Sequence, residues 1–403
     1  MSNHSSSEST ITGTAADAPQ FGVVFDIDGV LLRGHSEVAR SADALSLLTS
    51  TSSCSTAAAG SAGIEPTTAA SAEQAAASRS SDQHSHASNW AVPLLFVSNA
   101  SGYTEEKKAR LLRSHFGEKV GDDQVVLASS PLQQVSSLRE KRLLLVAHRI
   151  DEANTVAHKY GWQNVVHLED FYREHSYLWP LGDGDGQQQR QEQKKLADEP
   201  SSAFPTSTAV HKIEAVVIIH CPTTGWGEAI QVVSDVLQSD GTLGCWVDEQ
   251  CIPLYVTNYD LVYTTEYSKP RFTTGAFIRC LEMLHSSLTA RKLQIQRFGK
   301  PFASTYQYAE NVLSEQLRAG WGEHAGPLRR IYAIGDNPLS DIKGANERGD
   351  PWRSILVRTG CHTDEQNDKL FPADHFCEDA YAAVRYILEQ EAVLSRCSTL
   401  AQD

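Results

Sequence analysis

Short apolar runs alternate with longer stretches of helical periodicity along most of the chain. The apolar runs are continuous, which is typical of strands that are buried on both faces of a parallel sheet. We expect strands at 21–26, 94–98, 125–128, 142–147, 165–167, 214–219, 254–257, 331–335 and 354–358. We expect helices at 37–48, 104–116, 152–160, 227–239, 274–287, 305–318 and 379–390. This succession predicts an α/β fold with a doubly wound parallel sheet.

Two segments interrupt the pattern and contain almost no large apolar side chains. Residues 49–88 are mostly Ser, Ala and Thr, and residues 181–208 are rich in Gln, Gly and charged residues. Neither segment could bury enough apolar surface to offset the entropy that ordering would cost. We therefore predict that both are disordered insertions in surface loops, that residues 1–18 form a disordered N-terminus, and that residues 396–403 form a tail.

The composition excludes several classes of protein. With 403 residues, 41% of them hydrophobic, the chain can form two or three domains with a sizeable core. A formal net charge of −15 argues against a nucleic-acid partner, because such a protein needs a basic face. No apolar run approaches the roughly 20 residues that span a bilayer, so no integral membrane segment is expected. The eight cysteines include no C-x-x-C pair, which indicates reduced thiols in an intracellular compartment.

The first candidate for chemistry is the Asp26-Ile27-Asp28-Gly29 sequence, which follows the apolar run FGVVF. Ligands of parallel α/β sheets bind at the carboxyl ends of the strands, where these carboxylates would lie. Residues two apart on an extended chain point the same way, so Asp26 and Asp28 would face one spot, and Gly29 permits an immediate turn. Paired carboxylates repel unless a cation or a shared proton lies between them. Taken alone, an Asp-Gly turn that ends a strand explains the sequence equally well.

Three further candidates occur later in the chain. Asp336, Asn337 and Asp341 follow the apolar run IYAI, and their hard oxygen ligands suit Mg²⁺. Ser98 and Asn99 follow LLFV, where a hydroxyl and backbone N–H groups at a strand-to-helix turn could bind phosphate. Lys300 lies in a Gly-Lys-Pro loop and could neutralise charge on a transferred phosphoryl group. Each is weak by itself, because polar turns and solvated lysines are common.

The order of these motifs is more specific than any one of them. The D-x-D-G sequence, the Ser after a strand, the Lys-Pro pair and G-D-N-x-x-S-D resemble the four motifs of the haloacid dehalogenase (HAD) superfamily. The long segment between Ser98 and Lys300 resembles class IIA members, whose cap is an inserted α/β domain. Stretches such as DGVLLRG, FVSNASG, GKPFASTYQYAE and GDNPLSDIKGAN look similar to the cat-eye-syndrome-critical-region family of this class.

This resemblance implies a Rossmann-like core with a C2-type cap. The core would comprise residues 19–130 and 266–395, and the cap residues 131–265. It also implies a Mg²⁺-dependent phosphatase that acts through an aspartyl-phosphate on Asp26, with Asp28 as general acid and base. Asp26, the Asp28 main-chain carbonyl and Asp336 would then hold the Mg²⁺.

The remaining site residues have binding or supporting roles in the resembled family. Ser98, the Asn99 backbone and Lys300 would bind the phosphoryl oxygens. Asp341 would support the metal site or orient Lys300, and Asn337 and Gly29 would support the surrounding loops.

The cap departs from the family pattern at His148-Arg149 and at His220-Cys221-Pro222, and the loop after Arg271-Phe272 departs from it at Thr273 and Thr274. His220 and Cys221 are not spaced as a zinc site, so we expect a buried pair whose hydrogen bonds are satisfied.

We expect hydrolysis of small phosphate monoesters, such as sugar, glycerol or nucleotide phosphates, because a large cap would cover the site. The alternative is a protein that binds a phosphorylated metabolite or a partner with little turnover and is linked to glycerophospholipid metabolism. A phosphotransferring mutase is a third option, disfavoured because such enzymes carry a small helical cap at a different insertion point.

The sequence is compatible with a homo-oligomer and does not determine the oligomeric state. The resemblance points to mitochondria, whereas the first twenty residues contain no Arg or Lys and do not resemble a transit peptide, so a cytoplasmic location is the alternative.

Deleting residues 49–88 or 181–208 should leave folding intact, because neither segment carries apolar side chains that a core would need. Limited proteolysis of the full chain should cut first in these segments. A melting temperature lowered by about ten degrees or more in either deletion variant would contradict the prediction.

Overall fold

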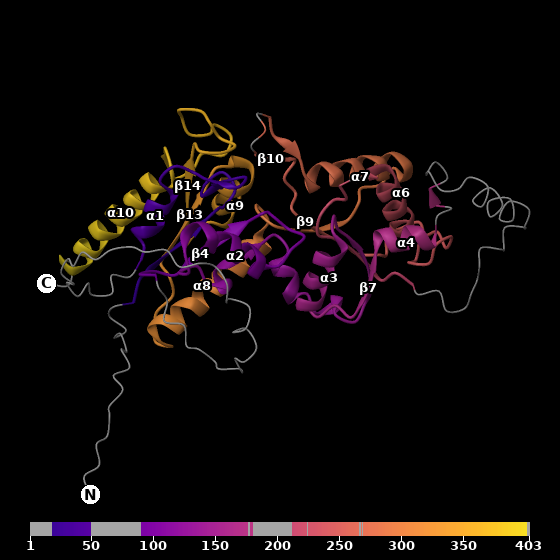
Figure 1. Ribbon diagram of the computed structural model, residues 1–403, viewed down its shortest axis with the longest axis horizontal. Helices are drawn as coiled ribbons and strands as arrows, with labels where there is room; N and C mark the ends of the chain where they lie inside the picture. Colours follow the sequence, from indigo (N-terminus) through magenta and orange to yellow (C-terminus); the bar gives the residue numbers. More distant parts are fainter. Residues whose placement is uncertain are drawn as a thin grey trace, which may run out of the picture.

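The computed structural model describes residues 18–49, 90–175, 178–179, 212–223, 225–265, 267 and 269–400, with side chains described up to residue 392. Residues 1–17, 50–89 and 180–211 lie outside this part of the chain, so the predictions for the N-terminus and for both insertions remain untested. The described chain forms two units of sheet and helix that lie side by side (Figure 1).

The first unit contains a six-stranded parallel sheet in the order β15-β14-β13-β1-β4-β5. Its strands are β1 (Phe21–Phe25), β4 (Leu94–Ser98), β5 (Val125–Leu127), β13 (Arg330–Gly335), β14 (Trp352–Val357) and β15 (His375–Cys377). Its helices are α1 (Ser41–Ser46), α2 (Glu105–Phe116), α8 (Ala303–Trp321), α9 (Lys343–Arg348) and α10 (Ala380–Leu400). Helix α10 runs to Leu400, so it includes the first residues of the predicted tail from residue 396.

Alternate residues of β1 explain why helices cover both faces of this sheet. Val23 and Phe25 pack in a core with α1, α2 and α10, whereas Val24 packs in a second core with α8 and α9. A strand buried on both faces has to be apolar at successive positions, and the sequence FGVVF meets this requirement. The doubly wound parallel sheet predicted from the sequence is confirmed.

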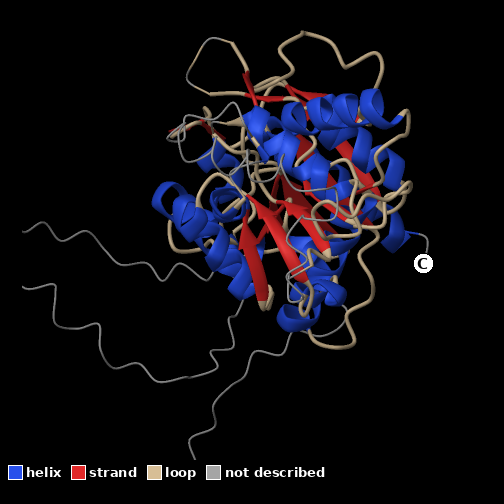
Figure 2. Cartoon of the chain, turned by 90° about the vertical axis from the view of Figure 1, so that its right-hand side faces the viewer, coloured by secondary structure: helices blue, strands red, loops and turns tan. Residues whose placement is uncertain are grey.

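The second unit contains a five-stranded parallel sheet in the order β12-β9-β8-β6-β7. Its strands are β6 (Arg142–Val146), β7 (Asn164–His167), β8 (Ala215–Ile218), β9 (Leu254–Thr257) and β12 (Ile295–Phe298). Its helices are α3 (Ile150–Lys159), α4 (Leu168–Glu174), α6 (Trp226–Leu237) and α7 (Thr274–Thr289). Figure 2 views the molecule from the side of this unit and shows strands flanked by helices.

The second unit extends further along the chain than the sequence predicted. Strand β12 pairs with β9, from Ile295 opposite Leu254 to Phe298 opposite Thr257. Phe277 and Leu281 of α7 pack in the same apolar cluster as residues of β8 and α6. The predicted end of the cap at residue 265 is therefore wrong, because the chain returns to the first sheet only after β12.

The elements that the sequence did not predict are short or polar. Among the helices and strands named here, they are the helices α4 and α9, the strands β12 and β15, the pair β2 (Leu32–Arg33) and β3 (Ser36–Glu37), and the pair β10 (Val262–Tyr263) and β11 (Arg271–Phe272). Strand β12 reads IQRF, and its middle two side chains are not buried, so it gives no continuous apolar run. In the described residues, every helix is too short or too polar to cross a membrane.

The strand order of the first sheet determines where the site forms. Strand β1 lies between β13 and β4, and all three run in the same direction. The residues that follow these strands therefore meet at one edge of the sheet, and Asp26 N donates a hydrogen bond to Ile334 O of β13 at 2.8 Å. The candidate side chains Asp26, Asn99 and Asp336 all follow these three strands directly.

Phe277→Ala should lower the free energy of unfolding by about 3–5 kcal/mol, because it opens a cavity where α7 packs on the second sheet. Leu288→Ala, on the same helix but 68% exposed, should change it by about 0.5 kcal/mol or less. Urea denaturation of both variants measures the difference, and equal effects would show that α7 does not pack as described.

Candidate active site

The Lys300 ammonium is the centre of the polar contacts at this edge of the first sheet. Its Nζ atom lies 2.5 Å from Asp26 Oδ1 and 2.8 Å from Asp341 Oδ1, and it donates a hydrogen bond to Val97 O at 2.8 Å. Lys300 is 5% exposed and Asp26 is 7% exposed. Burial lowers the pKa of Lys300, but the Asp26 and Asp341 carboxylates outweigh it and the net shift is strongly upward. The amine is therefore held as a cation.

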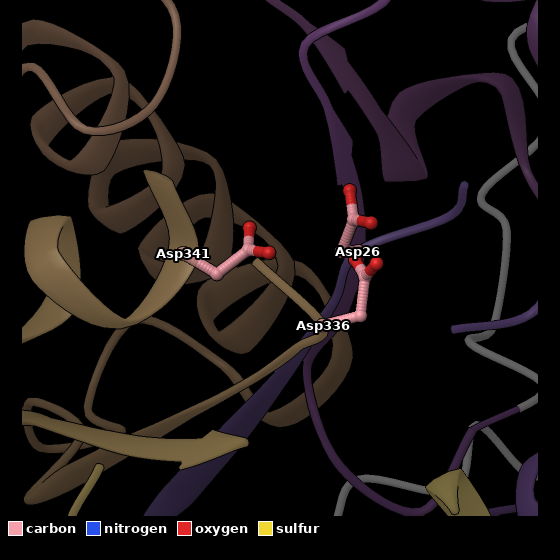
Figure 3. Close-up of side chains that lie close together, drawn as sticks. All are labelled: Asp26, Asp336 and Asp341. Carbon is pink, nitrogen blue, oxygen red and sulfur yellow. The ribbon is translucent and has the colours of Figure 1, made fainter. Parts of the chain in front are cut away.

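Three carboxylates lie within reach of one metal ion. Oxygen atoms of Asp26, Asp336 and Asp341 lie within 4.8 Å of one another, and all three residues are buried (Figure 3). Burial raises the pKa of Asp26 well above its usual value, and burial together with the neighbouring Asp341 raises the pKa of Asp336 to about 6. This excess of negative charge and the hard oxygen donors fit a divalent cation such as Mg²⁺.

The Asp336 side chain is held by backbone from two other loops. Cys361 N donates a hydrogen bond to Asp336 Oδ2 at 2.5 Å. Methyl groups at Gly29 or Gly360 would overlap the Asp336 carboxylate, so both positions exclude a side chain. Gly29 also has a φ of 106°, which side chains rarely permit. The predicted supporting role of Gly29 thus has a steric basis.

Asp28 has different neighbours from Asp26. Ser98 Oγ donates a hydrogen bond to Asp28 Oδ2 at 2.9 Å, and Lys108 Nζ of α2 lies 3.4 Å from both carboxylate oxygens. Loss of water raises the pKa of Asp28, but the Lys108 ammonium and the Ser98 hydroxyl outweigh it, and the net shift is downward. Sequence reasoning missed Lys108, because nothing in the α2 sequence distinguishes it from the exposed lysine beside it.

The Asn99 side chain joins the loops that follow β4, β9 and β12. Its Oδ1 accepts a hydrogen bond from Lys300 N at 2.6 Å, and its Nδ2 donates to Lys300 O and to Asp260 Oδ2, both at 2.8 Å. The sequence analysis did not identify Asp260, although it follows the apolar run LYVT closely, much as Asp26 follows FGVVF. Asn99 therefore positions Lys300 through its side chain.

The turn after β13 fixes Asp341. Asn337 N donates a hydrogen bond to Asp341 Oδ2 at 3.1 Å, and Asn337 Oδ1 accepts one from Leu339 N at 3.0 Å. A π-helical turn follows at Pro338–Ile342 and carries Asp341 into the site. The structure thus brings Asp26, Asp28, Ser98, Lys300 and Asp341 together with the other predicted residues.

A cavity of about 490 Å³ lies between the two units above these residues. Its floor carries the carboxylates and Lys300, and its roof carries residues of the second unit, among them His148, His220 and Trp226. His220 Nδ1 donates a hydrogen bond to Cys221 O at 2.7 Å, and Cys221 is buried whereas His220 is half-buried. His148 Nδ1 is buried and has no hydrogen-bond partner. Thr273, which also departs from the family pattern, lines the cavity as well.

Fold and site together define a hydrolase of the HAD type. Residues 23–163 match the haloacid dehalogenase-like hydrolase family, and residues 297–383 match the HAD-hydrolase-like family. A mitochondrial hydrolase of Saccharomyces cerevisiae is 26% identical over 91% of this chain and 95% of its own length. A cardiolipin synthase (CMP-forming)/mitochondrial hydrolase fusion protein of Schizosaccharomyces pombe is 28% identical over 74% of this chain, which spans only 48% of that protein.

Solved structures show the same fold at low sequence identity. A hypothetical protein from Pyrococcus horikoshii is 16% identical, with a TM-score of 0.55 over 91% of this chain and 99% of its own. A p-nitrophenyl phosphatase from Archaeoglobus fulgidus is 15% identical, with a TM-score of 0.53 over the same shares. The two family models together match more than half of the chain, which belongs to the haloacid dehalogenase-like hydrolases. Membership in class IIA and in the cat-eye-syndrome-critical-region family remains a prediction.

Asp260 gives a test of the electrostatics. Burial raises its pKa to about 6, despite the Asn99 hydrogen bond, so between about pH 4 and pH 6 the folded state binds more protons than the unfolded state. Stability should therefore fall as pH rises through this window, and Asp260→Asn should not share this loss. Urea denaturation in chelator should show the variant gaining about 2 kcal/mol relative to the wild type between pH 4 and pH 7. A pH-independent difference would contradict the assignment.

Proposed function

We propose that this protein is a Mg²⁺-dependent phosphatase that hydrolyses small phosphate monoesters through an aspartyl-phosphate on Asp26. The observation that carries the proposal is the position of the Asp26 carboxylate. It lies at the end of β1, beside Lys300 Nζ and within 4.8 Å of Asp336 and Asp341, on the floor of a cavity that the second unit covers. A nucleophile in this setting can approach a phosphorus atom whose charge is balanced by neighbouring cations.

Different residues of the site would carry out attack, proton transfer and phosphate binding. Asp26 attacks phosphorus and releases the alcohol, and Asp28 protonates the leaving oxygen and then takes a proton from the attacking water. The depressed pKa of Asp28 keeps its carboxylate ionised, which is the form that accepts a proton from water in the second task. The first task requires the protonated form of the same carboxyl group. Ser98, the Asn99 backbone and Lys300 hold the phosphoryl oxygens, and Asn99 fixes the Lys300 loop from both sides.

The Mg²⁺ would be held by Asp26, Asp336 and the Asp28 main-chain carbonyl, and it would supply charge neutralisation for the transferred phosphoryl group. Asp341 also lies within reach of the ion, and its contact with Lys300 suits the predicted supporting role. The substrate would be a small phosphorylated metabolite, because the cavity holds about 490 Å³ and the second unit closes it from above.

A second candidate function is low-turnover binding of a phosphorylated metabolite or partner in glycerophospholipid metabolism. The observation in its favour is the fission yeast relative, in which a similar chain is fused to a cardiolipin synthase. The names of both yeast relatives also support a mitochondrial location. The intact Asp26 and Asp28 pair favours catalysis over binding alone.

Asp26→Asn should lower kcat for p-nitrophenyl phosphate by several orders of magnitude, roughly 10³-fold or more, because an amide cannot form the covalent intermediate. Chelation of Mg²⁺ should abolish the wild-type rate, and added Mg²⁺ should restore it. The exposed Asp364→Asn is the matched control and should keep the wild-type rate. If Asp26→Asn retains most of the activity, the proposed mechanism is wrong.

A further inference from the structure

The floor and the roof of the cavity differ in charge. Among the described residues that line it, five are carboxylates and Lys300 is the single lysine or arginine. The carboxylates are Asp26, Asp28, Asp260, Asp336 and Asp341. Lys300 forms ion pairs with Asp26 and Asp341 on the floor, so it does not contact the part of a substrate that lies away from the transferred phosphate. Apart from Asp260, which accepts a hydrogen bond from Asn99 of the first unit, the described lining residues of the second unit are uncharged or histidine side chains.

The two roof histidines lie against each other, with ring centroids 4.3 Å apart. Burial and the neighbouring His220 lower the pKa of His148 to about 4, and burial lowers that of His220, so both rings are neutral at pH 7. His220 Nδ1 donates to Cys221 O, which leaves its Nε2 as an acceptor. His148 is packed close to Gly102 of the first unit, and its Nδ1 has no partner. A neutral His148 therefore favours the tautomer that places its proton on Nε2.

Three other cations, Lys108, Arg271 and Arg279, do not line the cavity and have other contacts. Lys108 pairs with Asp28, the Arg279 guanidinium lies 5.7 Å from the Tyr259 ring centroid, and that of Arg271 lies 4.5 Å from the Tyr267 ring centroid. An anionic group at the roof would thus meet carboxylates below it and no free cation among the described lining residues. A hydroxyl group would instead meet one imidazole acceptor and one imidazole donor.

We propose that this cavity takes phosphate monoesters whose leaving group is an uncharged alcohol with further hydroxyl groups, and that it rejects leaving groups with a carboxylate or a second phosphate. This inference rests on the proposed phosphatase function and specifies its substrate class. The roof supplies the selectivity: His148 and His220 bind hydroxyl groups, and Trp226 and Phe272 contact the carbon skeleton.

Matched pairs of esters test the selectivity on the wild-type protein. Glycerol 3-phosphate and 3-phosphoglycerate differ mainly by one carboxylate, and fructose 6-phosphate and fructose 1,6-bisphosphate differ by one phosphate. We expect kcat/KM to be at least about tenfold higher for the first member of each pair. Equal or higher values for the second members would overturn the inference while leaving the phosphatase function in place. Failure to hydrolyse any ester, including p-nitrophenyl phosphate, would overturn the phosphatase function itself.

Roof variants test the cause of the selectivity. Thr223 is exposed and lines the cavity, so Thr223→Lys adds a cation there, and Thr223→Gln is its neutral control of similar length. The Lys variant should raise kcat/KM for 3-phosphoglycerate relative to glycerol 3-phosphate by about fivefold or more over the Gln variant. An unchanged ratio would contradict an electrostatic origin.

The histidines have a separate readout. His220→Phe keeps a ring of similar shape but removes the acceptor, so KM for glycerol 3-phosphate should rise about tenfold. The rate with phenyl phosphate, whose leaving group has no further hydroxyl, should change less than about threefold. Equal losses on both esters would indicate a structural role for His220 and would overturn its assignment to hydroxyl binding.

Discussion

The contact of the Lys300 ammonium with Asp26 and Asp341 is the interaction on which the rest of the site depends. It joins a loop that returns from the second unit to carboxylates after β1 and β13 of the first. Removing one partner of a buried ion pair leaves an uncompensated charge, which is far more costly than losing an exposed pair. The Asn99 side-chain amide donates a hydrogen bond to the main-chain oxygen of Lys300 and accepts one from its main-chain nitrogen. These two bonds fix the backbone of Lys300 and thereby position its ammonium group.

The balance of charge determines what the site can accept. Lys300 offsets only part of the negative charge of the buried carboxylates, and burial together with the neighbouring Asp341 raises the pKa of Asp336. A divalent cation and one phosphate dianion can complete the balance on the floor of the cavity. The roof adds no further positive charge in the described residues, so the same arrangement that favours one phosphate disfavours a second anionic group.

The sequence predicted the sheet of the first unit and most of its site, because continuous apolar strands that end in polar residues are visible locally. Asp26 and Asp336 were found in this way, and the structure places them together. Lys108 was not predicted, because its contact with Asp28 depends on how α2 packs on the sheet. The sequence of α2 contains several charged residues, and it does not indicate which of them contacts the site. The second unit was assigned too early an end, because β12 is short and polar and its pairing with β9 spans a long stretch of chain.

The most direct test of the central claim is to look for the covalent intermediate on Asp26. Asp28→Asn should form the aspartyl-phosphate but hydrolyse it slowly, because the variant lacks the base that activates water. The variant is mixed with p-nitrophenyl phosphate and Mg²⁺, quenched in acid and examined by peptide mass spectrometry. The account predicts one added phosphoryl group on the peptide that contains Asp26, and none when Asp26→Asn is combined with it. A phosphoryl group on another residue, or its absence in a variant that still releases p-nitrophenol, would contradict the account.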